Sequence, residues 1–266
     1  MLVQAYLIKP TDLMIPFFRK IRKTLADDNK PIKYLRYAIG EIILVVIGIL
    51  IALQVNNQNN IHTEKRELQN YLEKIASNVK NDIIVSQNML TARTEQSALC
   101  ANATELISKR NFSINSQAII TEAMFTMMVE QPLNYNRSGF ESLKNSGYLR
   151  YLDNSKVERL IYNYYNATDK ILSEENSFQV WSNDLDLQLQ KNGFISQWLE
   201  LDARPNQKIT DAVGNYKDEL CKHPGHNIVL SLFYRGFLFT AYLTDFYKEQ
   251  ISAGKELLNA LQEYDE

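Results

Sequence analysis

An uninterrupted apolar run near the N-terminus constrains this chain more than any other feature. From Ile42 to Leu53 there is no polar side chain. The roughly eighteen residues from Ala38 to Val55 would form a helix about 27 Å long, close to the ~30 Å hydrocarbon core of a bilayer. The sequence therefore predicts a single transmembrane helix over residues 38–56, with lipid as a partner. A cleaved signal peptide is the competing interpretation, but its apolar region would be shorter and an A-x-A-like site would follow it.

The charges on the two sides of the run predict its direction across the membrane. Residues 1–37 contain eight Lys and Arg against three Asp, about +5, so the rest of the chain carries about −7 within the total of −2. Lys and Arg near the end of a span stay on the cytoplasmic side. We therefore expect a basic cytoplasmic arm over residues 1–37 and an exported domain over residues 57–266. The acidic balance of the exported domain argues against nucleic-acid binding.

Two features within the predicted span suggest functions. Glu41 lies one turn inside the span, where a charge is costly. It is either an intramembrane ion or proton site, or a carboxylate held at the depth of the interface by its neighbours. Gly40, Gly48 and Ala52 share one helix face, and small residues at this spacing let two helices approach closely. Helix–helix contact in the membrane, and hence self-association, is one expectation, although such residues are common in spans generally.

The pattern after the span predicts an all-α domain. Gly and Pro are scarce, with nine and six in the whole chain, and strand-like alternation is almost absent. Apolar residues recur at three- and four-residue steps in three stretches, which predict long helices over about 60–108, 154–192 and 227–262. Two short helices are expected at about 117–130 and 139–146. The resulting architecture is a bundle of three long helices plus short ones.

More detailed expectations concern helix ends and packing. Ser138 and Glu141 form a capping-box pattern, and Gly147 would close that short helix as a left-handed cap. The third long helix is apolar nearly all round, which is typical of a helix buried on several sides. We therefore expect it to be central, with side chains such as Phe237 buried. The first long helix becomes polar around Arg93, so weak packing is expected there.

Several motifs resemble a family that is defined only as a domain of unknown function. They are FFRKIR at residues 17–22, YAIGEIILVVIGILIALQ at 37–54, SGFESLKNSG at 138–147 and the pair Tyr164-Tyr165. Members of that family are single-span proteins of Gram-negative bacteria. The resemblance implies an inner-membrane anchor and a periplasmic domain, but no activity, cofactor or catalytic residue. Members begin at the position of Met14, so either translation starts there or residues 1–13 are an additional segment.

Histidine and cysteine offer two candidate sites. His223-Pro-Gly-His226 could suggest a metal site, but such a site needs three or four ligands, and His62 is predicted to lie beside the membrane. A plain turn is the preferred interpretation, and neither a metal nor another cofactor is expected. Cys100 and Cys221 would face an oxidising compartment, where they could form a disulfide or remain free.

The sequence lacks familiar catalytic motifs, including G-x-S-x-G, the P-loop, the dinucleotide fingerprint and H-E-x-x-H. We therefore do not expect an enzyme. The first hypothesis is a membrane-anchored interaction or scaffold module of the cell envelope that binds an unknown envelope protein. The alternative is a ligand-binding, sensory-type helical bundle that acts through a separate membrane partner. Five aromatic residues would either line its pocket or pack in the core: Tyr162, Tyr164, Tyr165, Trp181 and Trp198.

Overall fold

The computed structural model of the chain describes residues 31–129, 131–153, 155–200 and 218–265. The chain divides into two compact units, Met1–Arg66 and Glu67–Glu266. Every element among the described residues is a helix, which confirms the all-α class. The predicted basic arm up to residue 30 and the question of a start at Met14 lie outside the described residues.

Helix α2, Pro31–Ser108, joins the predicted span and the first long helix into one element of 78 residues. Its length follows from the sequence, because no Pro or Gly interrupts it after Gly48. The helix ends where Arg110 adopts a left-handed φ of 50°. There the N–H of Asn111 donates to the carbonyl of Leu106 at 2.9 Å, and that of Arg110 donates to Ile107 at 3.0 Å, so two carbonyls of the last turn are paired.

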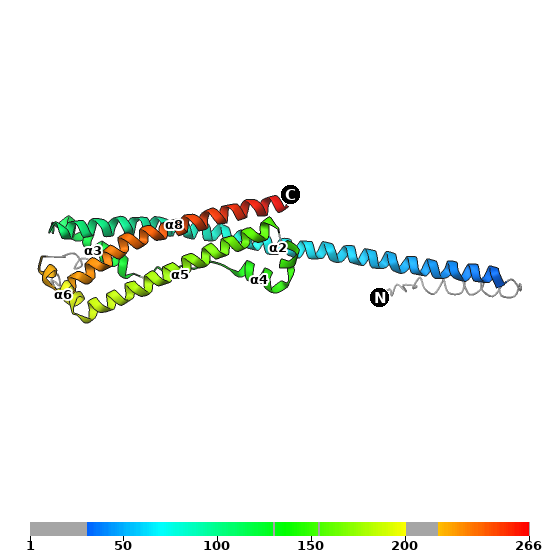
Figure 1. Cartoon of the computed structure of the whole chain (residues 1–266), viewed down its shortest axis with the longest axis horizontal. Coiled ribbons are helices and arrows are strands. Elements are labelled where there is room, and N and C mark those ends of the chain that lie inside the picture. The colour runs from blue at the N-terminus through cyan, green and yellow to red at the C-terminus, as the bar shows by residue number, and fades with distance from the viewer. Residues whose placement is uncertain (1–30, 130, 154, 201–217, 266) are drawn as a thin grey trace, which may run out of the picture. The chain divides into compact units, whose positions relative to one another are not determined.

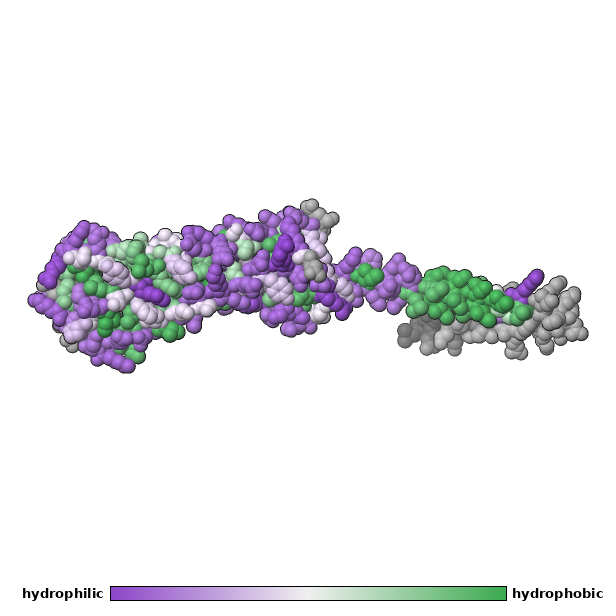
Figure 2. All heavy atoms as spheres, in the orientation of Figure 1, coloured by the Kyte–Doolittle hydropathy of each residue, from purple (hydrophilic) through white to green (hydrophobic). Residues whose placement is uncertain are grey.

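Within Met1–Arg66, no described residue outside α2 covers the apolar part of this helix. The side chains of residues 42–53 are exposed, and Figure 2 shows a continuous hydrophobic surface there. Among the helices of the described residues, α2 is the one that is long and apolar enough, by length and composition, to cross a membrane. Such a surface is costly in water, and a bilayer would remove that cost.

Seven further helices make up the described remainder of Glu67–Glu266. They are α3 (Ile114–Met128), α4 (Ser138–Ser146), η1 (Tyr148–Leu152), α5 (Lys156–Lys191), α6 (Phe194–Glu200), η2 (Asp218–Lys222) and α8 (His226–Asp265). The two later long helices and both short ones lie within a few residues of their predicted positions. In Figure 1, α5 and α8 run alongside the later part of α2, with α4 near one end of this unit and α3 and α6 near the other.

Helix ends were predicted with mixed success. Gly147 closes α4 with a φ of 78°, as predicted. The predicted capping box of α4 is wrong, because Arg137 is the N-cap and Ser138 is already the first helical residue. Helix α5, by contrast, has an N-terminal cap formed by a side chain. Its N-cap is Ser155, whose hydroxyl accepts a hydrogen bond from the backbone N–H of Glu158 at 3.0 Å.

The core of this unit consists of two apolar clusters. One joins the 68–83 part of α2 to α4, the first part of α5 and the last part of α8. The other joins the 100–107 part of α2 to α3, α6, the second part of α5 and the first part of α8. Helices α5 and α8 are therefore antiparallel, because the start of one shares a cluster with the end of the other.

The prediction that α8 is buried on several sides is wrong for one of its faces. Phe233 is fully buried and Phe246 nearly so, but Phe237 is 41% exposed. Gly236 allows the buried face to approach α2 and α3, since an added Cβ would lie only 2.6 Å from Cys100 Sγ and from Met127 Sδ. The apolar content of a helix does not reveal how many neighbouring helices cover it. No described residue of another element covers the outer face of α8 around Leu238 and Tyr242.

Candidate functional site

Buried polar side chains lie between the two apolar clusters. Along α2, residues 82, 86, 93 and 96 continue the register of the buried apolar stripe, but they are Asp, Ser, Arg and Gln. The expectation of weak packing around Arg93 is therefore wrong, since Arg93 and Gln96 are as buried as the apolar stripe from Leu68 to Ile83. We call the following set the polar layer: Asp82, Ser86, Arg93, Gln96, Tyr135, Tyr164, Glu175, Tyr247 and Gln250.

The ion pair of Arg93 and Glu175 is the centre of one half of the polar layer. Arg93 Nε donates to Glu175 Oε1 at 3.0 Å, and Arg93 Nη2 donates to Oε2 at 2.6 Å. The two side chains are only 3% and 8% exposed. The guanidinium also lies 5.1 Å from the ring centroid of Phe178. This two-pronged geometry is the strong form of a charge-assisted hydrogen bond.

Two more residues connect the ion pair to other helices. Gln96 accepts a hydrogen bond from Arg93 Nη1 at 2.6 Å and donates from Nε2 to the carbonyl of Thr126 in α3 at 2.7 Å. The hydroxyl of Tyr247 in α8 donates to Glu175 Oε1 at 2.5 Å. Burial, together with the negative charge of Glu175, raises the pKa of Tyr247, so this phenol remains a neutral donor.

The other half of the polar layer is a directional chain of hydrogen bonds. Ser86 Oγ donates to Gln250 Oε1 at 2.8 Å, and its single proton is then used. The hydroxyl of Tyr135, 2.8 Å from Ser86 Oγ, must therefore be the donor of that bond. Gln250 Nε2 donates to the hydroxyl of Tyr164 at 3.1 Å, which donates to Asp82 Oδ2 at 2.9 Å.

Asp82 is the acceptor at the end of this chain. Its Oδ1 accepts a second hydrogen bond, from the backbone N–H of Asn136 at 3.1 Å. Burial raises the pKa of Asp82, while these two hydrogen bonds oppose the rise. The carboxylate therefore fixes the segment that connects α3 and α4 to helix α2.

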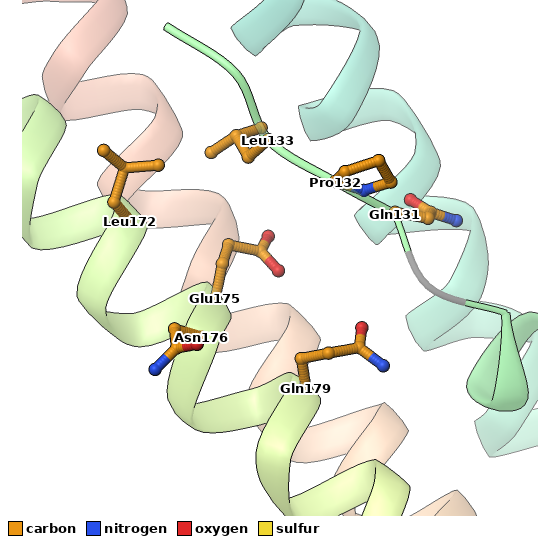
Figure 3. A pocket seen from close by; sticks show the side chains of 7 residues that line it. All are labelled: Gln131, Pro132, Leu133, Leu172, Glu175, Asn176 and Gln179. Carbon is orange, nitrogen blue, oxygen red and sulfur yellow. The ribbon is translucent and has the colours of Figure 1, made fainter.

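The polar layer reaches the surface at a pocket of about 260 Å³. Figure 3 shows the carboxylate of Glu175 directed from α5 towards the segment that holds Pro132 and Leu133. The pocket combines amide, carboxylate and apolar side chains. Its lining residues are Gln131, Pro132, Leu133, Leu172, Glu175, Asn176 and Gln179.

The site residues predicted within the span do not belong to this pocket. Gly40, Glu41, Gly48 and Ala52 all lie in the apolar part of α2, far along the chain from the polar layer. A Cβ added at Gly40 or Gly48 would meet nothing within 4 Å, so the face is open. An intramembrane polar site at Glu41 and self-association through the span both stay predictions.

The histidine and cysteine candidates are not brought together. His223 Nδ1 accepts a hydrogen bond from the N–H of Gly225 at 2.9 Å, in the turn that the sequence favoured. The part of the chain that the structure describes has no group of three or more His, Cys, Asp and Glu able to hold a metal. Cys100 and Cys221 are not joined by a disulfide. Burial raises the pKa of Cys100 to about 12, which keeps this thiol protonated and unreactive.

The aromatic residues considered for a pocket have other positions. Tyr164, Tyr165 and Trp198 are buried in the two apolar clusters. Trp181 lies against Arg235, whose guanidinium is 5.2 Å from its ring centroid, and Tyr162 is 40% exposed. None of the five lines the pocket beside Glu175, so the core-packing interpretation applies to the three buried ones.

Sequence reasoning did not single out Asp82 or Glu175. One signal could have located Asp82, because it continues the apolar register of α2. The pairing of Arg93 with Glu175, 82 residues apart, has no local signal. Gln131 and Gln179 likewise line one pocket only because the segment between α3 and α4 passes beside α5.

Comparison with known families gives one match. A model described as a family of unknown function, DUF6090, matches residues 41–201. The chain belongs to this family. In this DUF6090 member the matched stretch contains all seven pocket residues, whereas α8 lies outside it. The stretch begins at Glu41, so it does not include the FFRKIR motif at residues 17–22. No curated protein and no solved structure matches the chain.

Proposed function

We propose that the chain is a membrane-anchored interaction module of the cell envelope, with its N-terminus in the cytoplasm and its helical domain in the periplasm. The partner is a protein that presents an apolar helix to α8. One observation carries this proposal, the exposed uncharged face of α8. We call this face the α8 surface and define it by Tyr234, Phe237, Leu238, Ala241 and Tyr242.

The α8 surface has the composition and spacing of a helix-docking site. Tyr234, Leu238 and Tyr242 recur every four residues and are 57%, 61% and 50% exposed, with Phe237 beside them. No charged residue occurs from 236 to 244, so little charge would be desolvated on docking. Helix-in-groove partners use anchors at the same three- and four-residue steps. Exposed aromatic side chains gathered in this way are typical of interaction surfaces.

The apolar run of α2 supports the same proposal. A single span confines the module to the plane of one membrane, where it would meet partners anchored in the same bilayer. The basic arm before the run and the uncharged residues after it favour the N-in orientation. Among the described residues, the two buried carboxylates of the polar layer hold helices together: Glu175 pairs with Arg93, and Asp82 accepts from Tyr164.

Site-specific photo-crosslinking in living cells tests the proposal. A photoreactive residue at Tyr242 or Leu238 should form an adduct with a distinct partner protein. The matched control is Tyr264, which lies on the same helix and is 45% exposed but is outside the α8 surface. Adducts of equal yield at all three positions, or only with a second copy of the chain, would contradict the proposal.

A ligand-binding bundle is the second candidate function, and the pocket beside Glu175 favours it. Glu175 belongs both to the pocket and to the ion pair, and the ion pair is linked to α8 through Tyr247 and to α3 through Gln96. A bound molecule could therefore influence the packing of the whole unit through one side chain. A ligand-binding function of this kind would need a separate membrane protein to transmit the change that the ligand causes.

A further inference from the structure

We infer that the pocket beside Glu175 binds a small, neutral, polyhydroxylated molecule of the size of a hexose or hexitol. This inference deepens the ligand-binding candidate function and rests on it. It does not depend on the α8 surface, which lies on a different helix from every residue of the pocket.

The volume of the pocket sets the size of the ligand. Pockets for drug-sized ligands span roughly 300–1,000 Å³. The pocket beside Glu175 has about 260 Å³, so it suits a smaller molecule. Because α5 contributes four of the seven lining residues from a single face, at positions 172, 175, 176 and 179, one wall of the pocket is rigid.

The lining side chains suit a ligand with many hydroxyl groups. The primary amides of Gln131, Asn176 and Gln179 can each donate and accept hydrogen bonds, as each hydroxyl also can. Gln179 uses one N–H to donate to Asn183 Oδ1 at 2.8 Å, which leaves its carbonyl oxygen and a second N–H. Leu172 and Leu133, together with Pro132, provide apolar contacts for the C–H faces of a sugar ring.

The ion pair selects against charged ligands. Glu175 Oε1 accepts from both Arg93 and Tyr247, but Oε2 accepts only from Arg93 Nη2 among the described groups, so Oε2 can accept one more hydrogen bond. A ligand hydroxyl can supply it. The pair of Arg93 and Glu175 carries no net charge, so a charged ligand would gain little net attraction there while losing its hydration, and an anion would in addition meet the carboxylate.

Calorimetric titration of the full-length chain in lipid nanodiscs tests the inference. Nanodiscs avoid sugar-headed detergents, which would compete for the pocket. The probes are D-glucose, D-galactose, D-mannose and sorbitol, each at millimolar concentration, with glucosamine and glucuronate as charged comparisons. We expect saturable binding of at least one neutral probe, and weaker binding of its charged counterparts.

Two leucine variants locate the binding site. Gln179→Leu should weaken binding about tenfold, because it removes hydrogen bonds to the ligand while keeping the size of the side chain. The matched control is Gln190→Leu on the same helix. Gln190 is exposed and, like Gln179, donates to a side chain four positions away, here Asp186. This control should leave the affinity unchanged.

Three results would overturn the inference. They are no binding of any neutral probe, tighter binding of glucosamine or glucuronate than of the neutral sugars, and equal affinity of wild type and Gln179→Leu. Failure of this inference can be distinguished from failure of the interaction proposal, because photo-crosslinking at Tyr242 tests partner binding without any sugar. If cross-links form but no probe binds, the pocket inference alone is wrong.

Discussion

Replacing Arg93 by methionine should strongly destabilise the helical domain. The substitution removes two hydrogen bonds to Glu175 and one to Gln96, and leaves the Glu175 carboxylate buried with Tyr247 as its remaining donor. Breaking a buried ion pair in this way costs about 3–5 kcal/mol. For a domain of this size, each kcal/mol shifts the Tm by roughly 2–4 °C, so a drop of roughly 6–20 °C is expected.

A second substitution separates the cost of leaving the Glu175 carboxylate unpaired from the cost of lost packing around Arg93. Glu175→Gln, added to Arg93→Met, removes the buried charge while keeping an acceptor for Tyr247. The double variant should therefore be more stable than Arg93→Met alone, although each change removes a native contact. This non-additivity is the signature of coupled residues in a double-mutant cycle.

Thermal and urea unfolding of the full-length chain, followed by circular dichroism, would measure both effects. Lys156→Met provides the control, because Lys156 forms an exposed ion pair with Glu263 at 2.9 Å. Exposed pairs contribute about 1 kcal/mol or less, so this control should change the Tm little. Equal losses from Arg93→Met and Lys156→Met, or strictly additive losses in the cycle, would refute the buried-pair reasoning.

Three further predictions follow from burial. Since burial raises the folded-state pKa of Asp82 above its ordinary value of about 3.8, the contribution of Asp82 to stability should be largest below that value and decrease as the pH rises through the folded-state pKa; Asp82→Asn should lack this part of the pH dependence of unfolding. Phe233→Ala should cost about 3–5 kcal/mol in chemical unfolding and Phe237→Ala clearly less, because only Phe233 is fully buried; equal costs would contradict the exposure of the α8 surface. In the native state a thiol reagent should modify Cys221, which is only partly buried, but not the buried Cys100; detection of a disulfide between them by mass spectrometry would contradict the structure, in which they are not bonded.

The sequence predicts the helices well because their signals are local. Apolar periodicity locates α5 and α8, and the absence of Pro and Gly predicts the length of α2. Gly147 is predictable for the same reason, since a left-handed backbone position favours glycine. Ser138 shows the limit of local patterns, because its capping-box spacing is present and yet the helix begins one residue earlier.

The candidate site is less predictable, because its residues meet through tertiary contacts. Arg93 and Gln96 look like surface residues in sequence, and only the fold provides the Glu175 carboxylate and the Thr126 carbonyl that make their burial acceptable. Phe237 shows the converse. It looks like a core residue, but the position of α8 in the bundle leaves it half-exposed.

Membrane orientation is the central claim on which the envelope role depends. A phosphatase that is active only after export, fused after Glu266, measures it most directly. The basic residues before the apolar run predict an active enzyme in this fusion, and an inactive one when the phosphatase is fused before Ile32. The reverse pattern, with activity only in the N-terminal fusion, would contradict the account and place the helical domain in the cytoplasm.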